Sequence, residues 1–447
     1  MTESATDGAP THPVIHLSQL LKRPVIARNG DIVGALDDLI VRLLGVDTYP
    51  TVSGLVVNVG GRRVYVSVER IEHLDGDRVM LAQNKVDLRG FERREGEVLL
   101  RSDVLGHRLI DVPAAELVHA YDIELENPGH GWVLARLDTR RPARFFGLIK
   151  SHGGHASRDW KAFEPLIGHK HSMVVRRVGG RVGTLKPAQI ADLLEGADKR
   201  EGGEILDRVH TDPELEADVF EELDPGKANK LLADMSDVEV AGVLGLMRAD
   251  DAADAVAELR QSRRRRVLDL MPAGQRTKVI TLMGFNSSSA GGLMSVDVIS
   301  CAATATAAQA LSAISAARSM QPEALLKVHV LTDAGRLIGV ASVIRLLQSE
   351  SVTPIVDIMD TDPVRVTPVA DLTEVAVLMA DYNLATIPVV DDADHVVGVV
   401  TVDDVLEASI PDDWRRREPA PRPIVERATD HPTTNTTSTD PGGDDRG

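Results

Sequence analysis

The sequence predicts a multidomain α/β protein with an N-terminal β-barrel-like region, an all-α superhelical repeat domain and a C-terminal pair of similar α/β units. Three observations predict this architecture. The chain has 447 residues, which is more than one hydrophobic core usually serves. A twelve-residue repeat of large apolar residues runs through its middle, and a helix–strand–strand–helix pattern occurs twice after it.

The repeat occupies residues 212–284 in blocks of twelve. Each block ends on a large apolar residue and carries an apolar pair three or four positions earlier, which places these side chains on one helix face. Asp212, Asp224 and Ser236 begin their blocks and are expected N-caps. Helices of under three turns are not stable alone in water, so each must pack against a neighbour. The repeat therefore predicts a stacked helical solenoid.

Short strand patterns separated by turn signals fill the N-terminal region. Gly30 and Gly60 lie between apolar or alternating runs and predict two β-hairpins. The region resembles a PRC-barrel, a small β-barrel module, and this resemblance implies protein contacts without chemistry. It is carried by residues 20–25, 30–34 and 37–39, with a weaker second copy at 97–149.

The two α/β units after residue 286 resemble a pair of CBS domains. Residues 357–360, 387–391 and 398–404 carry this resemblance. Together with the acidic helical repeats and the junction at 290–294, the pair is similar to the cytosolic part of the MgtE magnesium channels and transporters. The similarity covers about residues 187–407. It implies that an N-domain and CBS domains hold Mg²⁺ between them, and because no membrane helices are expected after the pair, the chain is not expected to form a pore.

These patterns predict seven segments. They are a disordered segment at 1–13, a PRC-barrel-like domain at 14–95, a second PRC-barrel-like segment and linker at 96–172, MgtE N-domain-like repeats at 173–285, a first CBS domain at 286–351, a second at 352–410 and a disordered tail at 411–447.

Two groups of carboxylates are candidate metal ligands. Asp250, Asp251 and Asp254 lie in one repeat, where like charges four residues apart destabilise a helix. Asp403 and Asp404 begin the last helix of the second CBS-like unit. Both groups are also explained as helix N-termini, where acids interact well with the helix dipole. The resemblance to MgtE implies instead that the two groups share Mg²⁺, which prefers oxygen ligands.

Gly398, Thr401 and Asp404 are candidate cofactor-binding residues. They fit the Gly-x-x-Thr-x-x-Asp motif through which CBS pairs contact the ribose of adenine nucleotides. The alternative is a strand-to-helix turn capped by the threonine. In the first unit Arg345 replaces the aspartate, so at most one intact site is expected. Asp404 belongs to both predicted sites, so Mg²⁺ and the nucleotide are expected to compete or to be coupled.

Composition excludes several function classes. A net charge of −18 argues against recognition of nucleic-acid phosphates, and the basic run Arg263–Arg266 is expected to be a solvated face or an ion-pair partner of nearby acids. No stretch approaches the ~20 apolar residues of a membrane span, and no signal peptide is recognisable, so the protein is expected to be cytoplasmic. The chain lacks GxxxxGK[ST], HExxH and GxSxG motifs and is not expected to be an enzyme.

The sequence therefore predicts a regulatory, Mg²⁺-sensing protein that forms a homodimer through its CBS pair. Its expected partner is a membrane transporter or another protein. Two alternatives remain open: an adenine-nucleotide sensor, and an interaction scaffold with vestigial sites.

Overall fold

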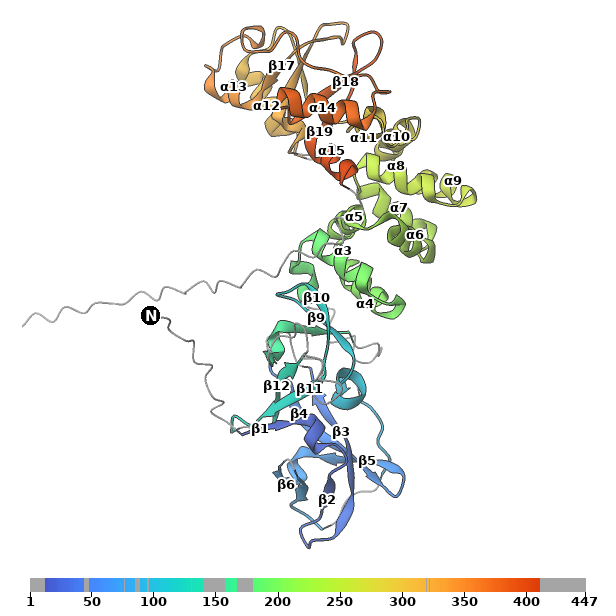
Figure 1. Cartoon of the computed structure of the whole chain (residues 1–447), viewed down its shortest axis with the longest axis vertical. Coiled ribbons are helices and arrows are strands. Elements are labelled where there is room, and N and C mark those ends of the chain that lie inside the picture. The colour runs from blue at the N-terminus through green and yellow to red at the C-terminus, as the bar shows by residue number, and fades with distance from the viewer. Residues whose placement is uncertain are drawn as a thin grey trace, which may run out of the picture. The chain divides into compact units, whose positions relative to one another are not determined.

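The structure is a computed structural model (Figure 1). It describes residues 13–43, 48–75, 77–84, 89–94, 96–129, 131–139, 157–166, 180–318, 320 and 322–410. The tail at 411–447 and residues 1–12, both expected to be disordered, lie outside the described residues. Among the described residues, no helix has the length and apolar character that a membrane crossing requires.

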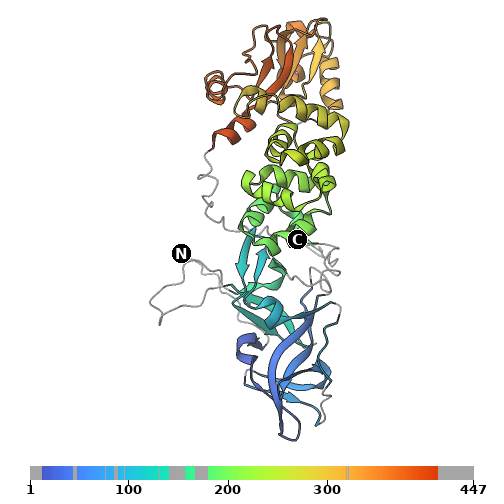
Figure 2. The ribbon, with the colours of Figure 1, turned by 90° about the vertical axis from the view of Figure 1, so that its right-hand side faces the viewer.

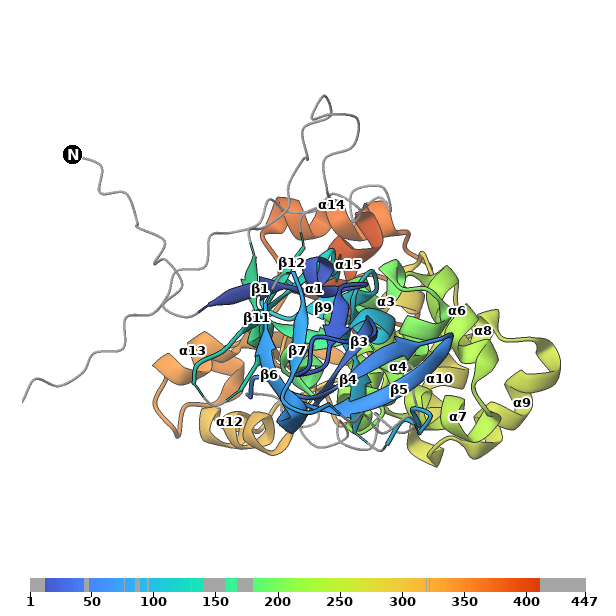
Figure 3. The ribbon, with the colours of Figure 1, turned by 90° about the horizontal axis from the view of Figure 1, so that it is seen from below.

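An eleven-stranded sheet dominates the described N-terminal region. Its strands are β1 (Val14–His16), β2 (Pro24–Ile26), β3 (Ile32–Arg42), β4 (Thr51–Val59), β5 (Arg62–Ser67), β6 (Ile71–Leu74), β7 (Val79–Leu81), β8 (Glu97–Leu99), β11 (Asp122–Glu126), β12 (Val133–Asp138) and β13 (Arg158–Asp159). The main order is β1-β11-β12-β4-β3-β2-β7-β6, and β3, β4 and β5 lie side by side (Figure 3). The short helix α1 (Leu17–Leu20) buries both of its leucines in the core of this sheet.

Both predicted hairpins are confirmed. Strands β2 and β3 pair antiparallel, and Gly30 in their turn has a φ of +91°. Strands β4 and β5 pair antiparallel through Gly60 and Gly61, with φ of +57° and +87°. Glycine occupies these positions because a side chain is rarely tolerated at positive φ.

The sheet joins strands from both sides of the expected boundary at residue 95. Strand β8 pairs with β3, and β11 pairs with β1. A second sheet contains β9 (Arg108–Asp111), β10 (Glu116–His119) and β14 (Phe163–Pro165) in the order β10-β9-β14. The two expected PRC-barrel-like segments thus share hydrogen-bonded pairing, and their resemblance to PRC-barrels stays a prediction.

The repeat domain is a series of short helices, as the twelve-residue pattern predicts. They are α3 (Pro187–Gly196), α4 (Lys199–Val209), α5 (Pro213–Glu222), α6 (Pro225–Asp234), α7 (Asp237–Leu246), α8 (Ala249–Glu258), α9 (Gln261–Leu270) and α10 (Ala273–Leu282). From α5 onward each helix begins twelve residues after the one before. The carboxylates of Asp212 and Asp224 and the hydroxyl of Ser236 accept backbone N–H groups at the starts of α5, α6 and α7, which confirms the three caps.

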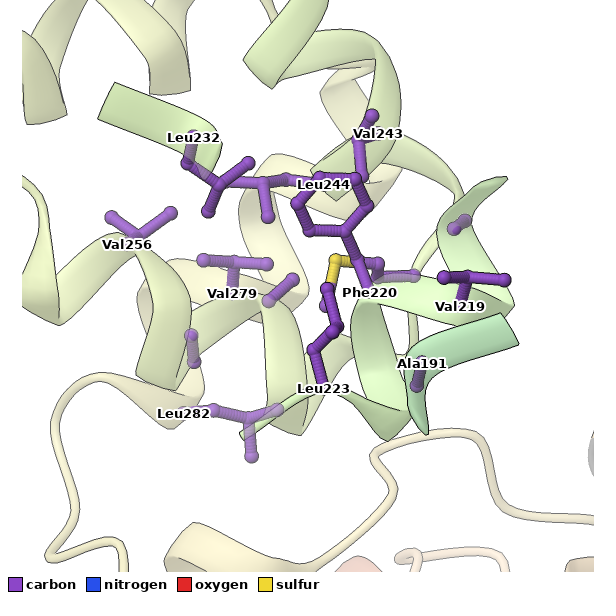
Figure 4. Packing of buried hydrophobic residues seen from close by; sticks show 14 of the residues in the cluster. Ala191, Val219, Phe220, Leu223, Leu232, Val243, Leu244, Val256, Val279 and Leu282 are labelled. Carbon is purple, nitrogen blue, oxygen red and sulfur yellow. The ribbon is translucent and has the colours of Figure 1, made fainter. Parts of the chain in front are cut away.

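Alternate helices of this domain pack on one another. Helix α3 packs against α5, α5 against α7, α7 against α9, and α8 against α10. Figure 2 shows these helices, coloured from green to yellow, as one stack. Val219, Phe220, Leu244, Val256 and Val279 are among the buried residues between them (Figure 4). The apolar face read from the sequence is therefore the core of a solenoid.

The two α/β units share one plan. The first contains β15 (Ser300–Ala302), α12 (Ala307–Ala316), β16 (Lys327–Leu331), β17 (Leu337–Ser342) and α13 (Val343–Gln348). The second contains α14 (Leu372–Tyr382), β18 (Thr386–Val390), β19 (Val396–Thr401) and α15 (Val402–Ser409). In each unit the two central strands, β16–β17 or β18–β19, pair antiparallel.

The segment that leads into each unit along the chain packs against the other unit. Helix α11 (Ala290–Leu293) and Ser295 precede the first unit along the chain. Ser295 nevertheless exchanges two backbone hydrogen bonds of 2.9 Å with Val399 on β19 of the second unit. Conversely, Asp360 exchanges backbone hydrogen bonds of 2.8 and 3.0 Å with Val340 in the first unit. The end of the repeat domain is therefore joined to the second unit. The divisions expected at 286–351 and 352–410 stay predictions.

Candidate functional site

An arginine immediately precedes the helix that carries Asp250, Asp251 and Asp254. Arg248 is the N-cap residue of α8, at the repeat position that Asp212, Asp224 and Ser236 take in earlier repeats. Its side chain does not cap the helix. Instead, the Oε1 atom of Glu221 on α5 accepts the Arg248 backbone N–H at 2.5 Å. A neighbouring helix thus satisfies this amide, and the guanidinium is left for other contacts.

A hydroxyl–carboxylate pair begins α15. The Thr401 hydroxyl donates to Oδ2 of Asp404 at 2.8 Å, and the Asp404 backbone N–H donates back to that hydroxyl at 3.3 Å. Both residues are buried. This exchange is a local helix-start arrangement, and it orients the carboxylate so that Oδ1 is available to another part of the molecule.

The Arg248 side chain joins the two helix starts. Its Nε donates to Oδ2 of Asp251 at 2.7 Å, and its Nη1 donates to Oδ1 of Asp404 at 2.9 Å. Its Nη2 lies 3.5 Å from Oε2 of Glu407 on α15. The Asp404 side chain is only 3% exposed and that of Arg248 22%, so these charge-assisted bonds are screened less than surface ion pairs.

The carboxylates here outnumber the single guanidinium. Burial raises the pKa of Asp250 to about 8, the Asp251 carboxylate adds to this rise, and Arg248 opposes it. Burial also raises the pKa of Glu221 to about 7. Burial raises the pKa of Asp404, again against the effect of Arg248. Burial therefore disfavours the charged form of Glu221, Asp250 and Asp404, and Arg248 offsets this effect in part.

The structure brings together three of the five predicted metal ligands. Asp251 and Asp404 bind Arg248, and Asp250 interacts electrostatically with both carboxylates. Asp254 and Asp403 are exposed, and Asp254 borders a hollow lined in part by the end of α10. In the described part of the chain, no group of three or more His, Cys, Asp or Glu has a geometry that could hold a metal ion. The metal site stays a prediction.

Each residue of the predicted ribose motif makes contacts within the fold. A Cβ atom on Gly398 would lie 2.5 Å from the Met294 sulfur and 2.9 Å from the Ser295 carbonyl oxygen. The glycine therefore admits the segment that leads in from α11. Thr401 and Asp404 bind one another, and Asp404 also binds Arg248. Nucleotide binding at these residues stays a prediction.

Sequence reasoning missed Arg248, Glu221 and Glu407. A basic residue at a cap position, directly before the three aspartates Asp250, Asp251 and Asp254, was the available signal for Arg248. Glu221 had no such signal, because it lies 27 residues before the amide that it caps. Neither did Glu407, which lies 159 residues from its guanidinium partner.

The basic run on α9 pairs with nearby acids. Arg263 Nε lies 2.6 Å and Arg266 Nε 2.8 Å from the carboxylate oxygens of Asp237. Arg263 also donates to the carbonyl oxygens of Leu232 and Met235. The ion-pair interpretation of this run is confirmed.

Comparisons with known proteins find two domain families in this chain. Residues 185–288 match the family model of the MgtE intracellular N domain, and residues 355–410 match that of the CBS domain. The magnesium transporter MgtE of Thermus thermophilus is 35% identical over 161 residues, which is 35% of this chain and 36% of that protein. The magnesium transporter MgtE of Enterococcus faecalis is 30% identical over 126 residues, 28% of each chain.

Similar solved structures include the cytosolic domain of the Mg²⁺ channel MgtE in complex with ATP. It is 27% identical, covers 53% of this chain and 94% of that chain, and has a TM-score of 0.49. The family models and the relatives confirm the resemblance to the MgtE N domain and to CBS domains. The matched part spans 36% of the length of the Thermus relative.

Proposed function

We propose that this chain is a regulatory protein that senses Mg²⁺ where its MgtE-type N domain meets its CBS region. The two matched domain families are regulatory rather than catalytic. The curated relatives are magnesium transporters, so the regulated process is magnesium transport. The protein acts in the cytoplasm as a homodimer that associates through the CBS pair. Its partner is a membrane transporter or another protein.

The observation that carries this proposal is the meeting of carboxylates from α5, α8 and α15. Mg²⁺ takes carboxylate oxygens, keeps several waters and needs few protein ligands. Asp250, Asp251 and Asp404 are the residues that would hold it. Burial raises the pKa of Asp250 and of Glu221, and a divalent cation beside these groups would favour their charged form.

The sensing step is a change in how the N domain meets α15. Asp250 and Asp251 belong to the repeat domain, whereas Asp404 belongs to the second unit. Positive charge between them favours their contact, and its loss favours separation by like-charge repulsion. Ion concentration is thereby converted into a change of the surface that a partner meets.

Isothermal titration calorimetry of the full chain with Mg²⁺ tests the proposal. Saturable binding is expected, and Asp250→Asn and Asp404→Asn are each expected to weaken it about tenfold or more. Asp381→Asn is the control, since Asp381 is an exposed aspartate at the end of α14. Asp403→Asn and Asp254→Asn show whether the two exposed candidates contribute as ligands. Absence of Mg²⁺ binding up to concentrations on the order of 10 mM contradicts the proposal.

An adenine nucleotide is the second candidate ligand. The hydrogen-bonded pair Thr401–Asp404 keeps the hydroxyl and carboxylate that the ribose motif requires. Titration with ATP, ADP and AMP separates the two ligands: Asp404→Asn abolishes nucleotide binding, and Asp250→Asn leaves it unchanged. An interaction scaffold with vestigial sites binds neither Mg²⁺ nor nucleotide.

A further inference from the structure

The small sheet β10-β9-β14 has two apolar faces. On its central strand β9, Leu109 packs in the core of the eleven-stranded sheet, and the next residue, Ile110, packs in the core of the repeat domain. On β10, Val118 pairs with Leu109 and packs in the first core. Leu117 pairs with Ile110 and packs in the second. Successive side chains of a strand point to opposite faces, so each face of the small sheet belongs to a different core.

Charged residues on the repeat-domain face bind helix α4 and the end of α3. Arg108 on β9 donates from Nε to Oε1 of Glu201 at 3.0 Å and from Nη1 to the Gly196 carbonyl oxygen at 3.0 Å. With the charges reversed, Glu164 on β14 accepts from Nε of Arg208 at 2.5 Å. The Glu201 and Glu164 side chains are 5% and 9% exposed, so both ion pairs are largely shielded from solvent and salt.

The other face of the small sheet is joined to the eleven-stranded sheet in the same way. Asp111 on β9 is buried and accepts a hydrogen bond from the guanidinium of Arg158, which lies on β13 of the eleven-stranded sheet. Phe163 on β14 pairs with Asp111 and packs in the core of that sheet. Separating a buried ion pair leaves uncompensated charge, so these contacts resist movement of the small sheet against either neighbour.

The contact between the repeat domain and α15 is held differently. One guanidinium, that of Arg248, reaches Asp404 and Glu407 there. On the other side of the repeat domain, the small sheet uses three guanidinium groups and two apolar faces. The contact with α15 is therefore the one expected to open first.

We propose that the small sheet couples the N-terminal sheets to the repeat domain, so that the two move as one arm. This inference rests on the proposed function, in which loss of Mg²⁺ separates the repeat domain from α15. The N-terminal sheets then move with the repeat domain, and the separation is transmitted to their surface. The N-terminal region is thus the output of the sensor, and the surface that a partner meets lies on it.

Distances between spin labels, measured by double electron–electron resonance on the full chain, test this coupling. The single native cysteine is removed by Cys301→Ser. Labels are attached at exposed positions of the eleven-stranded sheet, the repeat domain and the second unit, through Glu72→Cys, Lys230→Cys and Asp381→Cys. Excess unlabelled chain removes distances between subunits. The distances from label 381 to labels 230 and 72 should both shift between EDTA and Mg²⁺, whereas the distance between labels 72 and 230 should stay narrowly distributed and unshifted.

Arg108→Gln combined with Arg208→Gln is the uncoupling variant, and Arg136→Gln is the matched control. The double variant leaves two buried carboxylates without their guanidinium partners, so the distribution between labels 72 and 230 should broaden. Labels 230 and 381 should still respond to Mg²⁺, whereas the response between labels 72 and 381 should be lost. Arg136 pairs with Glu124 and Glu126 inside the eleven-stranded sheet, so its replacement should leave all three distances unchanged.

The outcomes separate this inference from the proposed function. If the distance between labels 230 and 381 is the same in EDTA and in Mg²⁺, the proposed function fails, and transmission by the arm fails with it. If that distance shifts and the distance between labels 72 and 230 shifts as well, the coupling alone is overturned. A narrow distribution between labels 72 and 230 in the double variant also overturns it. Should the double variant fail to fold by circular dichroism, Leu117→Ala replaces it, because this change removes packing from the same face, and an unchanged distribution then overturns the coupling.

Discussion

The first and second α/β units begin their last helices with the same turn but use it differently. In the first, the Ser342 hydroxyl accepts the Arg345 N–H, and the Arg345 guanidinium donates to the Ile358 carbonyl oxygen at 3.2 Å. In the second, Thr401 takes the place of the serine, and Asp404 binds Arg248 of the repeat domain. Both units share this turn, but the residue three positions after the hydroxyl is the basic Arg345 in the first unit and the acidic Asp404 in the second.

This difference shows how a duplicated unit acquires a separate role. Arg345 binds a carbonyl within the α/β pair, so it stabilises the fold locally. Asp404 presents an acceptor to another domain, so it couples the second unit to the helical repeats. Exchanging an acid for a base at one helix start changes which part of the chain the helix can bind.

The strongest test of this comparison removes the two differing side chains. Asp404→Ala should destabilise the contact by about 2–3 kcal/mol, because it leaves Arg248 partly buried with one strong acceptor fewer. Arg345→Ala should cost about 1 kcal/mol, the contribution of one hydrogen bond. Hydrogen–deuterium exchange of α8, α13 and α15 measures both effects.

The two variants should also differ in which helices exchange faster. Asp404→Ala should accelerate exchange in both α8 and α15, whereas Arg345→Ala should accelerate it in α13 alone. Equal exchange of α8 in the wild type and in Asp404→Ala would show that the second unit is not coupled to the repeats.

Replacing the glycine in the strand before each turn tests what the two units share. A Cβ on Gly339 would lie 2.6 Å from the Asp360 carbonyl oxygen, and one on Gly398 would lie 2.9 Å from that of Ser295. Gly339→Ala and Gly398→Ala should therefore each destabilise the fold by about 1–3 kcal/mol, because the neighbouring backbone has to move. Thermal denaturation measures both, and a harmless alanine at one position only would show that the two units do not share this close approach.

A pH titration gives the smallest expected effect and concerns the repeat-domain side of the contact with the second unit. The folded-state pKa values of Asp250 and Glu221, about 8 and about 7, lie above the ordinary values of 3.8 and 4.5. The folded protein then binds more protons than the unfolded one, so stability falls as the pH rises through the folded-state values. After allowance for solvent screening, we expect a loss of roughly 1 kcal/mol that begins near the ordinary values, at about pH 4, and is complete at about pH 8.

The double variant Asp250→Asn, Glu221→Gln is the comparison for this titration. Its melting temperature should fall less over the same pH range. His329 is buried with a lowered pKa, and it is present in both proteins, so its contribution cancels in the difference. Parallel curves for the two proteins would show that these carboxylates do not carry the pH dependence.

Much of the fold was predictable because its signals are local. The caps at Asp212, Asp224 and Ser236 act on amides two or three residues away, and the hairpin turns at Gly30 and Gly60 depend on the backbone of one or two residues. The exchange of leading segments between the two α/β units has no local signal, because it joins backbone groups such as those of Ser295 and Val399 that are far apart in sequence.

By itself, the sequence determined the helical period, the duplicated unit, the surplus of acids and three members of the charge cluster, Asp250, Asp251 and Asp404. Only the tertiary structure decided that these acids meet around Arg248, while Asp254 and Asp403 are exposed. The physical reason is that helix periodicity and capping act over a few residues of chain. Charge interactions depend instead on distance through space, and packing brought together a guanidinium and a carboxylate 156 residues apart.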